Sequence, residues 1–157
     1  MIFANYGKIP YGFLFTGKLY YDLNDKEDDY ACKPLNKFHE NFDNKADRFP
    51  IIMVDRGNCT FVTKSRNVQN LGGSMALIIN NREDESIDNV LMMDDGTGSD
   101  IYIPTIIISK KDGEKIKQFM IDNKNNTNMH DIMMTIEFDM VIFLLIILIS
   151  LFIFFSF

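Results

Sequence analysis

Short runs of branched apolar residues mark the buried strands of this chain. Residues 51–54 and 75–79 are continuous apolar segments of strand length, and residues 101–108 form a third run that contains Pro104. Runs of this length that are rich in Ile and Val favour strands covered on both faces. Because proline cannot donate to a strand ladder, the third strand is predicted to lie at an edge of the sheet or to carry a bulge.

A helix is predicted between the first two of these strands. Thr60 is a good N-cap residue, and Gly72-Gly73 stands where helices commonly end. Its two faces are predicted from helical spacing, with the Lys64 stem as an alternative inner position: Phe61, Ser65, Val68 and Leu71 inward, and Lys64, Arg66 and Asn67 outward.

A second helix is predicted after the third strand. Ser109 is its expected start, with Asp112 in a position like that of a capping box. Its inner face is expected to carry Ile116, Phe119 and Met120, and the polar residues 123–128 end it.

A period-two pattern, with apolar residues at every second position, marks a further strand before the apolar end of the chain. Residues 132–139 alternate with period two, which is typical of a strand exposed on one face, and residues 17–21 form an early strand. Strands that alternate with helices in this order predict a compact α/β or α+β domain with a mixed sheet.

The last 18 residues, 140–157, contain only Ser150 and Ser156 as polar residues. As a helix they would be about 27 Å long, the lower limit for a membrane span. A single-pass anchor is therefore predicted at residues 140–157, after a soluble domain at residues 1–139. Two alternatives stay open, namely a glycolipid-anchor signal and an end that is not native coding sequence.

The net charge of −6 belongs entirely to residues 1–139, because residues 140–157 carry no charge. Without a basic patch, nucleic acid is not an expected partner. Residues 1–13 lack the basic and apolar regions of a secretory signal, so a luminal domain here implies an incomplete start or a different topology.

The acidic loop at residues 94–100 offers two kinds of chemistry, and neither pattern is complete. Residues 95–99, Asp-Gly-Thr-Gly-Ser, differ from the aspartic-protease sequence by an inserted glycine, and no second copy supplies a partner carboxylate. Asp94, Asp95 and Asp100 lack the spacing of an EF-hand calcium loop. A solvated loop is the favoured interpretation.

Other catalytic or metal-binding patterns are also missing from the sequence. His39 and His130 are the only histidines. Neither belongs to a zinc motif, and neither is near Cys59 in the sequence to serve as its base. We therefore expect a binding module with no catalytic residues, no metal and no cofactor.

The turn after the strand at residues 51–54 is the best candidate site. Arg56, Gly57, Asn58 and Cys59 place a guanidinium and free N–H groups at a helix start, which suits a peptide carbonyl or carboxylate. The simpler alternative is that Arg56 pairs with Asp55 or with an acidic loop.

The two cysteines and two sequons bear on the compartment. Asn58-Cys59-Thr60 and Asn125-Asn126-Thr127 match the glycosylation pattern, with Asn125 the better acceptor and Asn58 the second. In an oxidising lumen Cys32 and Cys59 are candidates for a bridge, whereas in the cytosol they would be two buried thiols.

Several segments occur in a characteristic order: YGKIPYG, ACKPL, IIMVDRGNCTFVTKSRNVQNLGG, ALIINN, MMDDGTGSDIYIPTIIIS and GEKIK. Together they resemble the protease-associated (PA) domain, of the kind found in vacuolar sorting receptors, over nearly all of residues 4–139. The resemblance implies an α+β fold with a mixed sheet or open barrel flanked by short helices. It also implies a disulfide between Cys32 and Cys59.

The resemblance further implies a non-catalytic luminal module that binds polypeptide cargo at residues 56–59. Asn58 stands where plant receptors usually have Asp, so the cargo preference is expected to differ. The expected location is a single-pass protein facing the endomembrane lumen (Golgi, vacuole or lysosome) or the cell surface. Alternatives are a substrate-recruiting fragment of a membrane ubiquitin ligase or of a protease, and an anchored α/β protein without a ligand.

Overall fold

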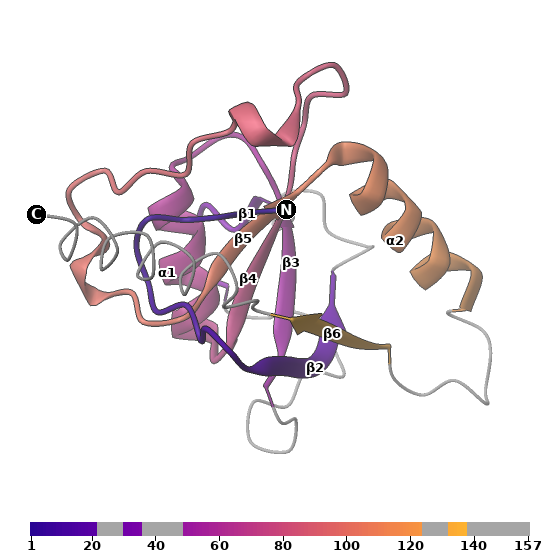
Figure 1. The fold of residues 1–157 in the computed structure, drawn as a ribbon, viewed down its shortest axis with the longest axis horizontal. Coiled ribbons are helices and arrows are strands. Elements are labelled where there is room, and N and C mark those ends of the chain that lie inside the picture. Colours follow the sequence, from indigo (N-terminus) through magenta and orange to yellow (C-terminus); the bar gives the residue numbers. More distant parts are fainter. Residues whose placement is uncertain (22–29, 36–48, 124–131, 138–157) are drawn as a thin grey trace, which may run out of the picture.

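The computed structural model describes residues 1–21, 30–35, 49–123 and 132–137, whose strands form one mixed sheet (Figure 1). The strand order is β1-β5-β4-β3-β2-β6. The strands are β1 (Ile2–Phe3), β2 (Leu14–Tyr20), β3 (Ile51–Asp55), β4 (Met75–Ile79), β5 (Thr105–Ile108) and β6 (Met133–Glu137). Strands β2 to β5 run parallel, and β1 and β6 pair antiparallel at the two edges.

The third predicted strand is shorter than expected and is not at an edge. β5 begins at Thr105, directly after Pro104, and lies between β1 and β4. The first position of a strand tolerates proline, and the Pro104 carbonyl still accepts a hydrogen bond from the Ala76 amide at 3.0 Å. The edge prediction was wrong because the two residues of β1, at the far end of the sequence, cover the outer side of β5.

Helices α1 (Phe61–Leu71) and α2 (Lys110–Asn123) cover opposite faces of the sheet (Figure 1). Alternate residues of β3 face the two sides. Ile52 belongs to the apolar cluster that contains Val62 and Val68 of α1. Ile51 belongs to the second cluster, against which α2 packs. Two short 3-10 helices, η2 (Ile87–Asn89) and η3 (Gly98–Asp100), lie in the long connection before β5.

The ends of α1 form as predicted, but its outer face does not. The Thr60 side chain accepts a hydrogen bond from the Thr63 amide, and Gly72 ends the helix with φ 104°. Asn67, predicted to point outward, is buried, and Lys64 takes the inner position that was given as the alternative for its stem. Segment 30–35 covers this side of the helix, and its carbonyl oxygens accept hydrogen bonds from both side chains. This face of α1 is therefore buried, although its polar side chains had suggested that it would be exposed to solvent.

The predicted inner face of α2 is correct in two of its three positions. Ile116 and Met120 pack against the second cluster, whereas Phe119 is 47% exposed. Ser109 caps the helix by accepting a hydrogen bond from the Asp112 amide at 3.1 Å. Gly113 lets α2 approach the sheet closely, since a Cβ there would stand 2.3 Å from a methyl carbon of Ile79.

Strand β2 divides its pairing between two neighbours. Its last residues, Leu19 and Tyr20, pair with β3, and its first five pair with β6. The predicted strand began at Gly17, where the observed strand passes against the backbone of Phe49. A Cβ on Gly17 would lie 1.9 Å from the Phe49 carbonyl oxygen. The absence of a side chain at this position allows the close approach.

Strand β6 confirms the alternation predicted for residues 132–137. Ile136 is buried and Met134 is half-buried, while Met133, Thr135 and Glu137 are exposed. Within the described residues, no helix is long and apolar enough to cross a membrane. Residues 140–157, Asn125, His39 and His130 lie outside the described part, so the predictions made for them stay predictions.

Candidate functional site

The candidate turn lies at the carboxyl end of β3, where the chain reverses into α1. The Arg56 amide donates to the Ile79 carbonyl at 2.9 Å, and the Cys59 amide donates to the Gly57 carbonyl at 2.8 Å. Gly57 has φ 133° and Asn58 has φ 63°. Glycine and asparagine tolerate these left-handed conformations better than other residues do, so the turn suits its sequence. Asn58 is exposed.

The turn is joined covalently to a distant segment. Cys32 and Cys59 form the disulfide that the resemblance implied, with a sequence separation of 27 residues. No free cysteine is left among the two in the chain, so Cys59 is not available as a nucleophile. The disulfide fixes segment 30–35 over the start of α1 and limits the movement of the turn.

Arg56 already has three partners within the domain. Its guanidinium donates to the Glu85 carboxylate at 2.6 Å and to the Asn80 side-chain oxygen at 2.8 Å. It also lies over the Phe61 ring, 5.6 Å from the centroid. The hydrogen bond from Arg56 is the main cause of the lowered pKa of Glu85. The structure therefore shows Arg56 in an ion pair with an acidic residue of a loop, namely Glu85 in the connection that follows β4.

The neighbouring Asp55 does not pair with Arg56. Its carboxylate accepts hydrogen bonds from the Lys117 ammonium at 2.9 and 3.1 Å and from the Tyr21 hydroxyl at 3.2 Å. Lys117 belongs to α2, so this ion pair ties α2 to the end of β3. The two adjacent charged residues thus bind different parts of the domain. Asp55 binds α2, and Arg56 binds the loop that follows β4.

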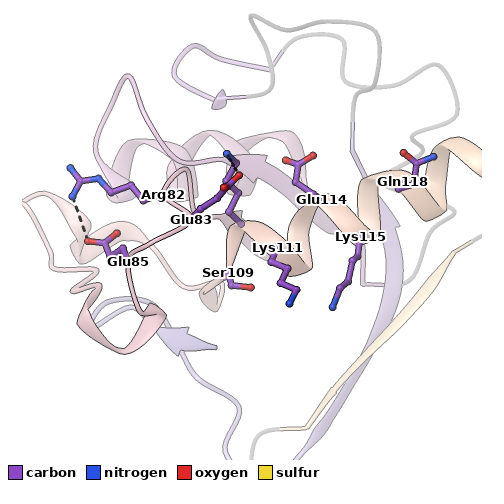
Figure 2. Close-up of a pocket in the computed structure, with 9 residues that line it drawn as sticks. Arg82, Glu83, Glu85, Ser109, Lys111, Glu114, Lys115 and Gln118 are labelled. Atoms are coloured by element: carbon purple, nitrogen blue, oxygen red, sulfur yellow. Dashed lines mark hydrogen bonds and ion pairs between the residues drawn. The ribbon is translucent and has the colours of Figure 1, made fainter.

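A pocket of about 590 Å³ opens beside the Arg56 ion pair, between the loop after β4 and the first turns of α2 (Figure 2). Glu85 belongs to both, because it lines the pocket and binds Arg56. The lining carries both signs of charge: Arg82, Glu83, Glu85, Ser109, Lys110, Lys111, Glu114, Lys115 and Gln118. In Figure 2 the Lys111 and Lys115 side chains extend from α2 in the same direction.

Most charges around this pocket are paired with one another. Lys110 pairs with Glu83 at 2.8 Å, and Arg82 pairs with Glu85 at 3.6 Å. Each pair has one exposed partner, Arg82 or Glu83, and ion pairs at the surface contribute little to stability. A charged ligand can therefore exchange them at small cost. The pocket offers donors and acceptors of both signs, which matches the backbone and ionised side chains of a polypeptide.

The acidic loop at residues 94–100 is stabilised by its own contacts. Asp94 accepts hydrogen bonds from the Gly96 and Gly98 amides at 2.9 and 2.8 Å. Hydrogen bonds from Thr97 and Thr60 lower the pKa of Asp95. Asp100 receives two hydrogen bonds from Arg66. Across residues 1–21, 30–35, 49–123 and 132–137, no group of three metal-ligating side chains is close enough to hold an ion.

Lys64 is a buried cation beside the disulfide. Its ammonium donates to the Tyr30 carbonyl at 2.5 Å and lies 3.7 Å from the Cys32 sulfur. Burial lowers the pKa of Lys64 from 10.5 to about 8, although the Asp55 charge raises it in part. The folded domain therefore binds this proton more weakly than the unfolded chain does.

The pKa of Lys64 predicts a stability that increases with pH in the mildly alkaline range. Between its folded pKa of about 8 and its unfolded pKa of 10.5 the unfolded chain holds more protons, so raising the pH favours the folded state. From about pH 7.5 to about pH 9.5 the free energy of unfolding should rise by about 2 kcal/mol. Urea titrations at the two pH values measure this change.

Lys64→Met is the matched variant for this pH prediction. It should remove most of the rise, and an equal rise in the variant would show that another group is responsible. Tyr6 does not change the stability in this pH range. Burial raises its pKa from 10.0 to about 12, so the folded state is destabilised by ionisation of Tyr6 only when the pH rises above 10.0.

Residues 15–116 match the family model of the PA domain. The chain belongs to the PA domain family. The matched span contains Cys32, Cys59, the Arg56 turn and the start of α2, so it covers the candidate site except Gln118 of the pocket. This confirms the family resemblance read from the sequence segments.

Three curated relatives place this PA domain among larger proteins. Signal peptide peptidase-like 3 of Arabidopsis thaliana is 39% identical over 75 residues, which cover 48% of this chain and 14% of the relative. Vacuolar-sorting receptor 2 of the same plant is 30% identical over 119 residues, covering 73% of this chain and 19% of the receptor. Receptor homology region, transmembrane domain- and RING domain-containing protein 6 of Arabidopsis is 30% identical, covering 57% and 28%.

A solved structure shares the fold. The zinc aminopeptidase BSAP from Bacillus subtilis superposes with a TM-score of 0.52 and 24% identity, covering 74% of this chain and 24% of the aminopeptidase. At this identity the likeness concerns the fold alone. The chain spans less than a third of the length of each of these four relatives.

Sequence reasoning found the turn but missed the residues that surround it. Arg56, Gly57, Asn58 and Cys59 are contiguous, so a local pattern revealed them. Glu85 and the α2 residues of the pocket lie far along the chain, in segments where no sequence motif indicated a site. The Glu-rich loop that follows β4 was the one available signal, since a loop at the carboxyl end of a parallel strand lies near the neighbouring turn.

Proposed function

We propose that this PA domain is a non-catalytic module that binds polypeptide at the carboxyl edge of its sheet. The observation that supports this most is the pocket that shares Glu85 with the Arg56 ion pair. The similarity to vacuolar-sorting receptors, which extends over 73% of this chain, adds the expectation of protein cargo. The site comprises the turn at residues 56–59 together with this pocket.

The binding step is an exchange of ion-pair partners. A carboxylate or carbonyl of the incoming peptide replaces Glu85 at the Arg56 guanidinium, and the released Glu85 can receive a peptide cation. Because Arg56 is only 23% exposed, its side chain is already held in place and loses little conformational freedom on binding. The exposed Asn58, where plant receptors usually have Asp, removes one negative charge and shifts the preference toward cargo with fewer cations.

Two substitutions test this exchange. Arg56→Ala should weaken the binding of short peptides with free termini about tenfold, because a charge-assisted hydrogen bond is lost. Glu85→Gln should strengthen the binding of peptides that offer a carboxylate and no cation, since Arg56 is then released from its ionic partner. Isothermal titration of the full chain in detergent measures both effects.

Arg66→Ala is the matched control for the peptide measurements. Arg66 makes a similar ion pair with Asp100 at 2.8 Å but does not line the pocket. Unchanged affinity in Arg56→Ala would exclude Arg56 from the site. Weaker binding in both Arg56→Ala and Glu85→Gln would mean that Arg56 only positions the loop.

The context proposed for this module is the lumen of the endomembrane system or the cell surface. Residues 1–139 form the PA domain, residues 140–157 anchor it to the membrane as a single pass, and Asn125 and Asn58 are candidate glycosylation sites. Expression in cells followed by alkaline carbonate extraction and glycosidase treatment tests these points. Release of the protein by carbonate would contradict the membrane anchor. Unchanged electrophoretic mobility after glycosidase treatment would contradict the glycosylation.

A second candidate function is recruitment of substrate to an enzyme. The 39% identity to a signal peptide peptidase-like protein and the similarity to a RING domain-containing protein favour it. The same pocket would then deliver polypeptide to a protease or a ubiquitin ligase. A transcript that encodes a peptidase or RING domain beside this chain would support recruitment over cargo sorting.

A further inference from the structure

Lys64 of α1 is a completely buried cation that has no carboxylate within ion-pair distance in the described part of the chain. Its ammonium donates to the Tyr30 carbonyl and lies over the Tyr30 ring, 5.4 Å from the centroid. Burial lowers the pKa of Lys64, and the charge of Asp55 offsets this only in part. A buried charge without a counter-ion is unfavourable, so the site favours a change that creates an anion beside Lys64.

The group beside Lys64 that can become an anion is the Cys32 sulfur, 3.7 Å from the ammonium nitrogen. In the disulfide this sulfur is neutral, whereas in the reduced protein a neighbouring lysine favours its thiolate. The carbonyl oxygens of Tyr30 and Gly57 lie 3.6 and 3.7 Å from the same sulfur and oppose the thiolate. They carry only partial charges, whereas Lys64 carries a full charge at the same distance, so the thiolate is favoured.

The two sulfurs of the disulfide have different surroundings. Among the described residues, the Cys59 sulfur has no cation within hydrogen-bond distance, and its nearest acceptor is the Tyr30 carbonyl at 4.0 Å. Both sequence neighbours of Cys59 are exposed, whereas Cys32 follows the completely buried Ala31. In thiol–disulfide exchange the sulfur with the lower thiol pKa is the better leaving group. An incoming thiolate should therefore attack Cys59, and Cys32 should leave.

We propose that Lys64 makes the Cys32–Cys59 disulfide reducible by a dithiol, with Cys59 as the attacked sulfur. A thiolate of the dithiol bonds to Cys59 as the bond to Cys32 breaks, and the electron pair of that bond stays on Cys32 beside the Lys64 ammonium. The second thiol of the dithiol loses its proton to solvent, and its sulfur then displaces Cys59, which takes a proton from solvent. The dithiol becomes a disulfide, and the protein gains two electrons. The turn at residues 56–59 is then no longer joined to segment 30–35.

Equilibration with mixtures of oxidised and reduced dithiothreitol tests the role of Lys64. The chain has two cysteines and both are in the disulfide, so alkylation of thiols reports on this bond alone. The full chain in detergent is compared with Lys64→Met, which removes the charge, and with Lys64→Arg, which keeps it. Arg66→Met is the matched control, because it removes a cation of the same helix that pairs with Asp100. Circular dichroism verifies the fold of each variant.

Lys64→Met should lower the equilibrium constant for reduction about tenfold, which is a shift of about 30 mV toward a more negative potential. Lys64→Arg should keep most of the wild-type value, and Arg66→Met should equal the wild type. An unchanged constant in Lys64→Met would overturn the proposal. An equal decrease in Lys64→Met and Arg66→Met would also overturn it, because the effect would then not depend on the cation beside Cys32.

A second measurement uses the wild-type chain and so does not depend on how any variant folds. Brief exposure to reduced glutathione, followed by iodoacetamide, traps the mixed disulfide that forms first. Peptide mass spectrometry should find glutathione on Cys59 and the alkyl group on Cys32. Glutathione found mainly on Cys32, or equally on both cysteines, would overturn the proposed direction of attack.

Discussion

Replacing both Cys32 and Cys59 by alanine is expected to lower the free energy of unfolding substantially. The disulfide joins residues that are 27 positions apart, and it holds segment 30–35 over Lys64 and Asn67 of α1. The loss of the loop constraint in the unfolded chain alone predicts a decrease of about 3.5 kcal/mol. Urea unfolding followed by circular dichroism measures it.

A thiol reductant provides the control for the disulfide prediction. It should shift the wild-type transition toward that of the Cys32→Ala/Cys59→Ala variant and leave the variant itself unchanged. A decrease smaller than about 1 kcal/mol would mean that packing, and not the covalent link, holds segment 30–35 in place. Peptide affinity should also fall in the variant, because the turn that carries Arg56 loses its fixed partner.

Gly17→Ala is expected to have the second large effect. The added Cβ would stand 1.9 Å from the Phe49 carbonyl oxygen and 3.1 Å from a side-chain carbon of Ile51. Since a backbone oxygen cannot move aside as a side chain can, β2 must shift away from β3 or release β6. We expect a loss of about 3 kcal/mol in the free energy of unfolding, at the upper end for an overpacked position.

Gly96→Ala is the comparison for Gly17→Ala. No atom lies within 4 Å of the Cβ that would be added there, but the backbone has φ 92°. This variant measures the cost of a left-handed conformation without a clash, about 1 kcal/mol. Similar losses in the two variants would show that steric contact at Gly17 is not the dominant effect. Thermal unfolding of both variants side by side gives the answer.

The elements whose signals are local were predictable from sequence. The Thr60 cap, the Gly72 termination and the continuous apolar run of β4 need only neighbours within a few residues. Such signals predicted both helices and five strands with errors of a few residues at their ends, including β5, which begins only after its proline. The two-residue strand β1 carried no comparable signal, so the neighbour that places β5 inside the sheet could not be foreseen.

The errors on α1 have the same origin. Lys64 and Asn67 are polar, and helical spacing alone gave no sign that a distant segment would cover them. Segment 30–35 does cover it, and its carbonyls satisfy the two side chains at 2.5 and 2.9 Å. A polar residue can be buried when its hydrogen bonds are supplied, and the partners here are more than thirty residues away.

One part of the candidate site was predictable from the sequence, and the other part was visible only in the structure. The sequence by itself determined the turn of Arg56, Gly57, Asn58 and Cys59, because a glycine and an asparagine between a strand and a helix specify that geometry locally. It also identified the family, through the order of its segments. Only the tertiary structure decided that Arg56 pairs with Glu85 and that a pocket opens beside that pair. Those contacts depend on which parallel strands are neighbours, and strand order is set by the packing of the whole sheet.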